Sequence, residues 1–368
     1  MNFSYWERQF ISDKADLVVL GAGITGLSTA YFAAQKFPKW KIIVLEKFSK
    51  STAASTRNAG FSCFGSAGEI LDDLKNSQNE DDVFSTVKMR YEGLQLMKNI
   101  LGKEKIEYSE CGGMELFNPD QDVEVDEVLS KLDFLNSSIF DFTGTTDTFK
   151  IDSIPAALKG FKTAIFNKHE GKLNPGLMLR AWRELCTENN VEIHFGAEAK
   201  LDSDFKGVFI QNHYILSHQI AVCTNGLTSK LGLNIDVKPA RNLILLTKRL
   251  PSLDLESTYH HQKGYFYFRK IHERLLIGGG RHLFENEEFS SEFMVNEKIK
   301  SHLLAYLKHH FGIDHNQIEH EWTGIMGVSK SKNALVKRLN SNLICGVRLG
   351  GMGIAIGSLV GKKTAELL

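Results

Sequence analysis

Residues Asp16–Glu46 read DLVVLGAGITGLSTAYFAAQKFPKWKIIVLE and carry the strongest structural signal in the chain. An apolar run at 17–20 leads into the glycine turn Gly21-Ala22-Gly23-Ile24-Thr25-Gly26, and helix-forming sequence follows. A second apolar run at 42–45 ends in Glu46. Strand, glycine turn, helix, strand and acid together form the βαβ fingerprint of dinucleotide-binding domains.

Each part of this fingerprint has a physical role. Gly21 allows the tight turn out of the strand, Gly23 lets a pyrophosphate approach the backbone, and Gly26 lets the helix pack closely on the strand. The helix N-terminus offers free N–H groups and a positive dipole end to phosphates. Glu46 lies 20 residues after Gly26, where a carboxylate accepts hydrogen bonds from ribose hydroxyls and disfavours the 2′-phosphate of NADP. A glycine turn alone is common, but the correctly spaced flanking segments favour a nucleotide site over an ordinary βαβ turn.

The composition excludes several other classes of protein. The 368 residues contain 44 Lys plus Arg and 44 Asp plus Glu, a balance that gives no reason to expect a nucleic-acid partner. There is no apolar run of about 18 residues and no signal-peptide core, so we expect a cytoplasmic protein without a transmembrane segment. The five cysteines are scattered without a CxxC pair, and the histidines lack ligand spacing, so no metal site is predicted.

The two ends of the chain share one pattern, and the middle differs from it. A second glycine turn, from Arg348 to Gly353, follows an apolar strand and precedes a closing helix, so both ends are predicted to form one nucleotide domain. Residues 239–285 are rich in strands without helices between them, which indicates an antiparallel sheet in a second domain. Residues 47–68 are dense in small side chains, and this composition fits a ligand-lining segment and a surface loop about equally.

With these segments in place, the chain resembles the D-amino acid oxidase-like family of FAD-dependent oxidoreductases over nearly its whole length. The resemblance rests on the opening fingerprint, on Ala54–Phe61 (ASTRNAGF), on Ala221–Gly226 (AVCTNG) and on the turn Gly350–Gly353. It implies an α/β FAD-binding Rossmann-like domain with a discontinuous α+β substrate domain built on an antiparallel sheet. We predict an FAD-binding domain from 1–75, 150–235 and 325–368, and a substrate-binding domain from 76–149 and 236–324.

The resemblance implies an FAD held by segments far apart in the sequence. The sarcosine oxidases of the family attach FAD through a Cys in the strand that corresponds to 321–329, and this segment has none, so the FAD should be non-covalent. The residues expected to contact it are Gly21, Gly23, Ile24, Thr25, Gly26, Glu46, Lys47, Ser55, Thr56, Arg57, Asn58, Ala59, Gly60, Ala199, Thr224, Asn225, Gly226, Arg348, Leu349, Gly350, Gly351, Met352 and Gly353.

The implied reaction is hydride transfer from a C–H bond beside an amine to flavin N5, which gives an imine that hydrolyses in water. The expected partner is therefore a small amine or amino acid. The predicted substrate-site residues are Tyr265, Tyr267, Arg269 and Met326, with His260 as a further candidate. For the two tyrosines the alternative is an ordinary aromatic position in a strand.

Two positions depart from the family pattern. Met326 stands where amino acid oxidases of the family place an Arg that binds the substrate carboxylate, so a plain α-amino acid is not expected unless Arg269, Arg281 or Arg348 takes that role. Leu276 falls near the place of the oxygen-activating Lys of the sarcosine oxidases, which leaves open a dehydrogenase that uses another electron acceptor.

Two functions from other classes are kept as alternatives. One is a flavin-binding protein without amine oxidation, because familiar substrate residues are missing. The other is an NAD-dependent dehydrogenase, against which the RNAG segment and the second glycine turn argue. The sequence leaves the oligomeric state open.

Overall fold

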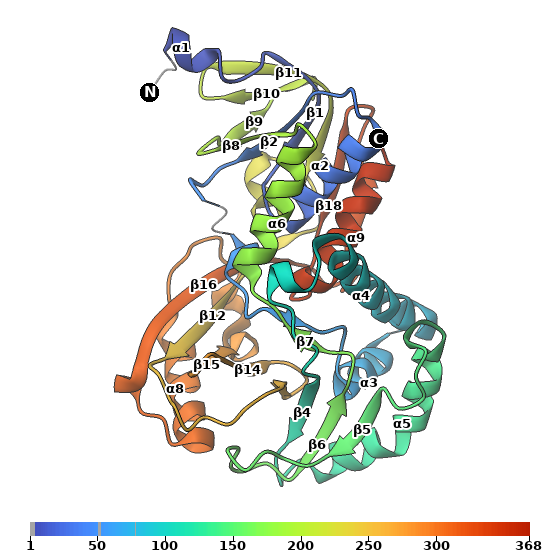
Figure 1. Ribbon diagram of the computed structural model, residues 1–368, viewed down its shortest axis with the longest axis vertical. Coiled ribbons are helices and arrows are strands. Elements are labelled where there is room, and N and C mark those ends of the chain that lie inside the picture. Colours follow the sequence, from blue (N-terminus) through green and yellow to red (C-terminus); the bar gives the residue numbers. More distant parts are fainter. Residues whose placement is uncertain (1–3, 51–52, 78) are drawn as a thin grey trace.

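The structure is a computed structural model and describes residues 4–50, 53–77 and 79–368. Figure 1 shows two bodies stacked along the long axis, each with a large β-sheet. The described residues leave out 1–3, 51, 52 and 78, all of which fall in the predicted domain segments. Of these, residues 51 and 52 also belong to the segment 47–68 that is rich in small side chains.

The first sheet is mainly parallel and contains the opening βαβ unit. Its strand order is β17-β18-β11-β1-β2-β8, in which β17 is antiparallel and the others run parallel, while β9 and β10 extend β11 as an antiparallel flap. The strands are β1 (Lys14–Leu20), β2 (Ile42–Glu46), β8 (Glu192–Phe195), β9 (Ala199–Leu201), β10 (Gly207–Ile210), β11 (His213–Val222), β17 (Leu335–Arg338) and β18 (Leu343–Val347). The prediction of a Rossmann-like parallel sheet is confirmed.

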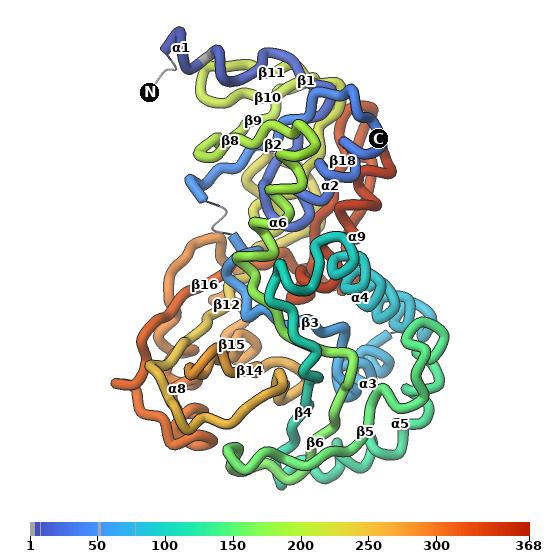
Figure 2. The backbone as a smooth tube through the Cα atoms, in the orientation of Figure 1, coloured from blue at the N-terminus to red at the C-terminus, as the bar shows by residue number. Residues whose placement is uncertain are grey.

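Both faces of the central strands of this sheet are covered, one by α-helices and the other by the β9–β10 flap and residues 231–237, which explains their continuous apolar sequence. Leu17 and Val19 face one core while Val18 and Leu20 face another, and all four are buried, as expected for a parallel sheet covered on both sides. The helices α2 (Ile24–Lys36) and α9 (Gly353–Glu366) come from opposite ends of the chain and pack side by side, as the blue and red tubes in Figure 2 show. The helix α6 (Pro175–Glu188) begins at Asn174, whose side chain accepts hydrogen bonds from Gly176 and Leu177 N–H.

The second sheet occupies the lower body in Figure 1 and is antiparallel except where β4 and β13 run parallel. Its order is β16-β12-β15-β14-β13-β4-β6-β5. The strands are β4 (Gly113–Phe117), β5 (Phe149–Asp152), β6 (Thr163–Asn167), β12 (Lys238–Thr247), β13 (Thr258–His261), β14 (Phe266–Ile271), β15 (Arg274–Gly279) and β16 (Ile318–Val328). The helix α8 (Glu297–Phe311) packs on one face through a core that includes Phe266 and Phe268.

The pairing of β5 and β6 corrects one predicted boundary. Both strands belong to the second sheet because β6 pairs antiparallel with β4, and β5 pairs with β6. Residues 150–167 had been predicted as part of the cofactor domain, so the change of sheet does not occur at residue 150. The chain returns to the first sheet only through α6 and β8. The division into a cofactor domain and a substrate domain otherwise stays a prediction.

Three helices pack against one another at the side of the lower body in Figure 1. They are α3 (Ala67–Asn76), α4 (Glu80–Leu101) and α5 (Asp122–Thr143). Gly93 lets α4 approach α9, because a Cβ at this position would lie 2.1 Å from the Ala355 carbonyl oxygen. This contact holds α4 against the start of α9, where the second glycine turn ends.

The remaining strands and helices are short. A two-stranded sheet joins β3 (Phe61–Ser62) to β7 (Gly171–Lys172), and the short helices are α1 (Tyr5–Arg8) and α7 (Glu285–Glu288). Among the described residues, no helix combines the length and the apolar character needed to cross a membrane.

Candidate functional site

A cavity of about 980 Å³ runs between the two sheets, a volume at the upper end of the range of roughly 300–1,000 Å³ for ligand pockets. It is lined by the opening glycine turn, by the segment that follows residue 52, by the second glycine turn at residues 348–353 and by the open face of the second sheet. It therefore brings together the segments from which the cofactor and substrate predictions were made.

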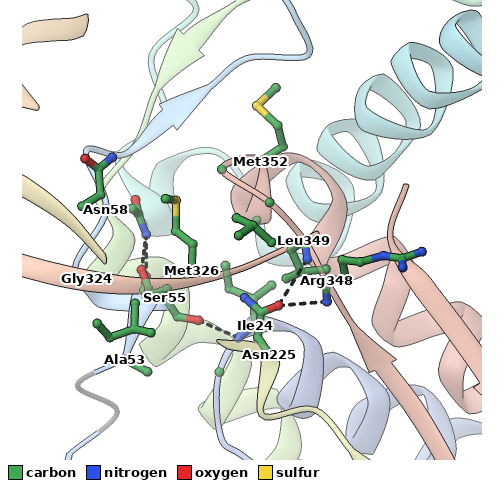
Figure 3. A pocket seen from close by; sticks show the side chains of 18 of the residues that line it. Ile24, Ala53, Ser55, Asn58, Asn225, Gly324, Met326, Arg348, Leu349 and Met352 are labelled. Atoms are coloured by element: carbon green, nitrogen blue, oxygen red, sulfur yellow. Dashed lines mark hydrogen bonds between the residues drawn. The ribbon is translucent and has the colours of Figure 1, made fainter. Parts of the chain in front are cut away.

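The glycine turn forms one end of the cavity and leaves backbone groups open. Gly21 has a φ of +100°, which a residue with a side chain rarely adopts, and a Cβ at Gly23 would lie 2.9 Å from Ser55 Oγ. Ser55 Oγ accepts a hydrogen bond from Ile24 N–H at 3.1 Å, as Figure 3 shows. At the N-terminus of α2 the glycines thus leave the backbone open to the cavity, with the small Ser55 side chain beside it, which suits a pyrophosphate.

Glu46 lies at the end of β2, beside this turn, and lines the cavity. Its carboxylate accepts hydrogen bonds from Ala22 N–H at 2.9 Å and Phe48 N–H at 3.1 Å. Burial raises the pKa of the Glu46 carboxyl, while these two N–H donors oppose the rise. Lys47 forms an ion pair with Glu198 at 2.6 Å. Glu198 directly precedes Ala199, which lines the cavity.

The segment from Ser55 to Gly60 is held in shape by its own side chains. Asn58 Nδ2 donates to the carbonyls of Ala54 (3.0 Å) and Ser55 (2.9 Å), and Asn58 Oδ1 accepts from Gly60 N–H (2.8 Å). Arg57 Nη1 donates to the Thr323 carbonyl at 2.8 Å. The predicted Arg57 and Asn58 therefore line the cavity with side chains whose polar groups already bind protein.

Asn225 joins the end of β11 to the second glycine turn. Its Oδ1 accepts from Arg348 N–H at 2.9 Å and from Leu349 N–H at 3.2 Å, drawn as dashed lines in Figure 3. Gly350 N–H also donates to the Gly327 carbonyl at 2.9 Å. In this view Met326 is drawn between Asn58 and the second glycine turn. The turn is thus fixed from β11 and from β16.

The strand register places one row of side chains across the open face of the second sheet. In order across the sheet, the row is Ile244, Gly278, Tyr267, His260 and Glu115. Gly278 leaves room for the Tyr267 ring, since a Cβ there would lie 2.5 Å from it. Tyr267 Oη accepts a hydrogen bond from Asn242 Nδ2 at 2.8 Å, and burial raises the pKa of the phenol.

The far end of this row is buried and charged. His260 Nε2 lies 2.9 Å from Glu170 Oε2. Burial opposes a charge on the imidazole, but the Glu170 carboxylate outweighs burial and raises the pKa of His260. Glu115 accepts from Ser66 Oγ and Gly68 N–H, both at 2.8 Å, and burial raises the pKa of its carboxyl to about 7.

Most predicted site residues line the cavity. Of the four predicted substrate-site residues, Tyr265, Tyr267 and Met326 line it, and Tyr265 is half-exposed and stacked on His282. The predicted cofactor residues that line it are Gly21, Gly23, Ile24, Thr25, Glu46, Lys47, Ser55, Arg57, Asn58, Ala59, Gly60, Ala199, Thr224, Asn225, Arg348, Leu349, Gly350, Gly351, Met352 and Gly353.

Four predicted residues do not line the cavity. Gly26 packs α2 on β1, because a Cβ there would lie 1.8 Å from the Gly21 carbonyl oxygen, and Gly226 makes room for the Met326 carbonyl in the same way. Thr56 lies in the 3-10 turn Ala54–Thr56. Arg269 is buried and donates from Nη2 to the Leu173 carbonyl at 3.0 Å, and burial lowers the pKa of its guanidinium to about 10. A direct contact between Arg269 and a substrate therefore has no support.

The cavity also contains charged residues that the sequence analysis missed. They come from different elements and form ion pairs in the cavity wall: Glu69 with Arg90 at 3.0 Å, and Asp72 with Lys263 at 2.7 Å. Within the described ranges, no cluster of His, Cys, Asp or Glu has the arrangement of a metal site. The one sequence signal for these residues is the charge at position 90, which stands among apolar residues at helical spacing in what is now α4.

The fold and the site together define a flavoprotein oxidoreductase. The open backbone at Gly21 and Gly23, the buried Glu46 and the turn completed from residues 348–353 fit the pyrophosphate, ribose and ring system of FAD. The family model of FAD-dependent oxidoreductases (DAO) matches residues 16–367, and the chain belongs to this family. FAD is therefore its cofactor, as the sequence resemblance implied.

Relatives and solved structures agree with this assignment. The chain is 22% identical to "Probable oxidoreductase OrdL" of Haemophilus influenzae, over 97% of this chain and 83% of that protein. Its fold is similar to L-proline dehydrogenase from P. horikoshii, with 16% identity, a TM-score of 0.75, and coverage of 97% of this chain and 94% of the other. Glycine oxidase from Geobacillus kaustophilus has the same identity and a TM-score of 0.74, with 97% and 95% covered.

Proposed function

We propose that the protein oxidises a C–N bond of an amine or amino acid with FAD as the electron acceptor. The observation that carries the proposal is the continuity of the cavity, which runs from the glycine turn to the row of Tyr267 and His260 without a dividing wall. A small substrate bound at that row would share one space with the cofactor. The proteins of similar fold include L-proline dehydrogenase and glycine oxidase, whose names indicate amine substrates, and also L-α-glycerophosphate oxidase, whose name indicates an alcohol. The fold is therefore compatible with both substrate classes, and the choice of an amine rests on the sequence resemblance.

The proposed reaction is balanced as follows. The C–H bond beside the nitrogen would break, its hydride would pass as two electrons and a proton to bound FAD, and the N–H proton would leave to water as a C=N bond forms. Water then adds to the imine and releases a carbonyl compound and an amine or ammonia. FAD supplies the two-electron acceptor chemistry, and the side chains of this chain position the substrate and limit the access of water.

Tyr267 is the positioning residue that we propose for this step. Asn242 Oδ1 accepts a hydrogen bond from Leu243 N–H at 3.1 Å, which fixes the orientation of the Asn242 amide. The amide therefore turns its Nδ2 toward Tyr267, and the tyrosine oxygen is the acceptor of that hydrogen bond. The tyrosine O–H is then free to donate to a substrate atom. Because burial raises the pKa of this phenol, Tyr267 stays protonated at neutral pH.

A dehydrogenase that uses an acceptor other than oxygen is the second candidate. Leu276 lies where the resemblance places the oxygen-activating Lys of the sarcosine oxidases, and it is buried against Ala59 and Ile244. An apolar group at this point offers no positive charge to a reduced oxygen species. Comparing the reoxidation of the reduced enzyme by oxygen and by a soluble quinone separates the two candidates.

The decisive experiment is an anaerobic screen of the purified holoenzyme. D- and L-amino acids, N-methyl amines and polyamines are added in turn, and the flavin absorbance is followed. We expect at least one of these classes to bleach the flavin and to release a carbonyl product. If none of them bleaches a flavin that dithionite still reduces, the protein is a flavoprotein without amine oxidation and the proposal is wrong.

A further inference from the structure

The helix α4 buries two charged side chains, Arg90 and Lys98, and of these two only Arg90 lines the cavity. Val83, Val87, Leu94 and Met97 form the apolar side of the helix, and Arg90 lies among them with 4% of its surface exposed. A buried guanidinium is costly unless its N–H groups find acceptors. Its presence at this position therefore calls for partners.

The protein provides acceptors for only part of this guanidinium. Arg90 Nη1 donates to Glu69 Oε1 at 3.0 Å and to the Phe64 carbonyl at 3.3 Å. Within residues 4–50, 53–77 and 79–368, Nε and Nη2 have no hydrogen-bond acceptor. Arg90 lines the cavity, so these donors are placed where a ligand can reach them.

The surroundings hold Arg90 in place and keep its partner ionised. Burial works against the charged Glu69 carboxyl, but Arg90, helped by Lys332 and His260, outweighs burial and holds the pKa of Glu69 below its usual value. Glu69 and His260 line the same cavity, and His260 forms its own pair with Glu170. The charges on this wall are thus paired, while one edge of Arg90 keeps unused donors.

A carboxylate matches this unused edge. The Nε and Nη2 groups of arginine form a planar fork that binds the two oxygens of a carboxylate in parallel. We propose that Arg90 binds the carboxylate of the substrate and thereby selects amino acids over plain amines. This inference rests on the proposed amine oxidation, and it assigns the anion-binding role to a helix rather than to the strand that carries Met326.

The other arginines considered for this role are less suited. Arg348 is committed to Asp236 Oδ2 at 3.0 Å and to the Asn333 carbonyl at 2.8 Å. Arg269 does not line the cavity. Arg281 lines it, but it is more exposed and pairs with Glu285 at 3.0 Å, four residues along the chain.

The test measures ligand binding to the FAD-loaded protein without requiring turnover. Benzoate and its neutral analogue benzamide are titrated while the flavin absorbance is followed. We expect Arg90→Met to weaken benzoate binding at least tenfold and to leave benzamide binding within twofold. Arg90→Lys keeps the charge but not the fork, so it should give an intermediate loss. The matched control, Arg281→Met, should change neither ligand more than twofold.

A double variant protects the test against misfolding. Arg90→Met leaves the Glu69 carboxylate buried without its partner, whereas Arg90→Met with Glu69→Gln removes both charges. FAD content and the dissociation constant for FAD should remain within threefold of wild type in the double variant. A larger loss of FAD would show that Arg90 supports the cofactor, and this result would overturn the proposal.

Further outcomes separate this inference from the proposed function. Unchanged benzoate binding in the folded double variant, or a wild-type protein that binds neither benzoate nor acetate, overturns the Arg90 inference. Flavin bleaching by plain amines but by no amino acid also overturns it, while amine oxidation stands. Benzoate binding that depends on Arg90, in a protein that no amine or amino acid reduces, supports the carboxylate site and rejects the proposed function.

Discussion

The two ends of the cavity are formed by different groups, backbone at the cofactor end and side chains at the substrate end. The cofactor end is made of backbone groups, in which Gly21 and Gly23 keep the N-terminus of α2 open and Asn225 fixes the second turn. The substrate end is made of side chains that the strand register brings into one row, such as Tyr267 and His260. Backbone sites depend on close packing and tolerate no added atoms, whereas a side-chain wall can be changed residue by residue without loss of the fold.

The largest effect should come from glycine substitutions at the cofactor end. A Cβ at Gly26 meets a backbone carbonyl at 1.8 Å, so Gly26→Ala should destabilise the fold by about 4 kcal/mol or more and give little soluble holoenzyme. A Cβ at Gly23 meets only the Ser55 side chain, at 2.9 Å, so Gly23→Ala should fold but bind FAD more than tenfold more weakly. Thermal unfolding and FAD titration distinguish the two. Equal stability of the two variants would contradict the comparison.

The next effect concerns the buried acid at the substrate end. Burial raises the pKa of Glu115 to about 7, so its neutral form stabilises the fold fully below the ordinary carboxyl pKa, and this contribution is lost as the pH rises through about 7. The shift corresponds to about 3 kcal/mol. Glu115→Gln should therefore gain about 2–3 kcal/mol of unfolding free energy over wild type between pH 5 and pH 8, measured with urea.

The control for Glu115 is Glu188→Gln, at an exposed position on α6. Its stability relative to wild type should not change with pH over the same range. If Glu115→Gln behaves like this control, ionisation of the Glu115 carboxyl does not lower the free energy of unfolding, and the pKa of this carboxyl is not raised in the folded protein.

A smaller effect is expected at the junction of the two ends. Asn225→Ala removes the acceptor of the Arg348 and Leu349 N–H groups, so FAD should bind about tenfold more weakly, which is about 1.4 kcal/mol. Asn225→Asp keeps an acceptor oxygen and tolerates the left-handed φ of +46°, so it should lose less. The readout is the dissociation constant of FAD. The role of Asn225 would be disproved if both variants bound FAD like wild type.

The smallest effect is expected at Met326. Met326→Leu conserves volume, so the fold should lose less than about 1.5 kcal/mol of stability. Because the cavity keeps an apolar group of similar size, kcat/KM for the best substrate should change less than about threefold, which is about 0.7 kcal/mol. Met352→Leu, on the same cavity, is the matched control. A tenfold loss confined to Met326→Leu would show that the thioether has a specific role that its position does not explain.

The same contrast explains how far the sequence could predict the structure. The opening βαβ unit, the parallel sheet and most cofactor residues were predictable because glycines and an acid at fixed spacing report local backbone geometry. Arg57 and Asn58 were found by motif, but their side chains bind the Thr323 carbonyl and the Ser55 segment, which only the fold shows.

The substrate end was less predictable because the register between strands, and not the spacing of residues along the sequence, brings its side chains together. Glu170 lies in a loop far from His260 in the sequence, and no local pattern links them. Residues 150–167 were predicted in the cofactor domain, but β5 and β6 pair in the second sheet. The sequence does not reveal this, because strand pairing with β4 leaves no local pattern. Arg269 was predicted at the substrate site, yet it does not line the cavity and donates to the Leu173 carbonyl instead. Arg90 did leave a signal, a charge on an apolar stripe, which was not recognised.

The bond network of Asn225 has a consequence for how the protein is made. The glycine turn at residues 21–26 is synthesised before the turn that completes the cofactor site, which follows residue 347, and before α9, which packs beside α2. Domains generally begin to fold from the N-terminal side during synthesis. A nascent chain therefore carries an unfinished cofactor site until residues 348–353 have been added.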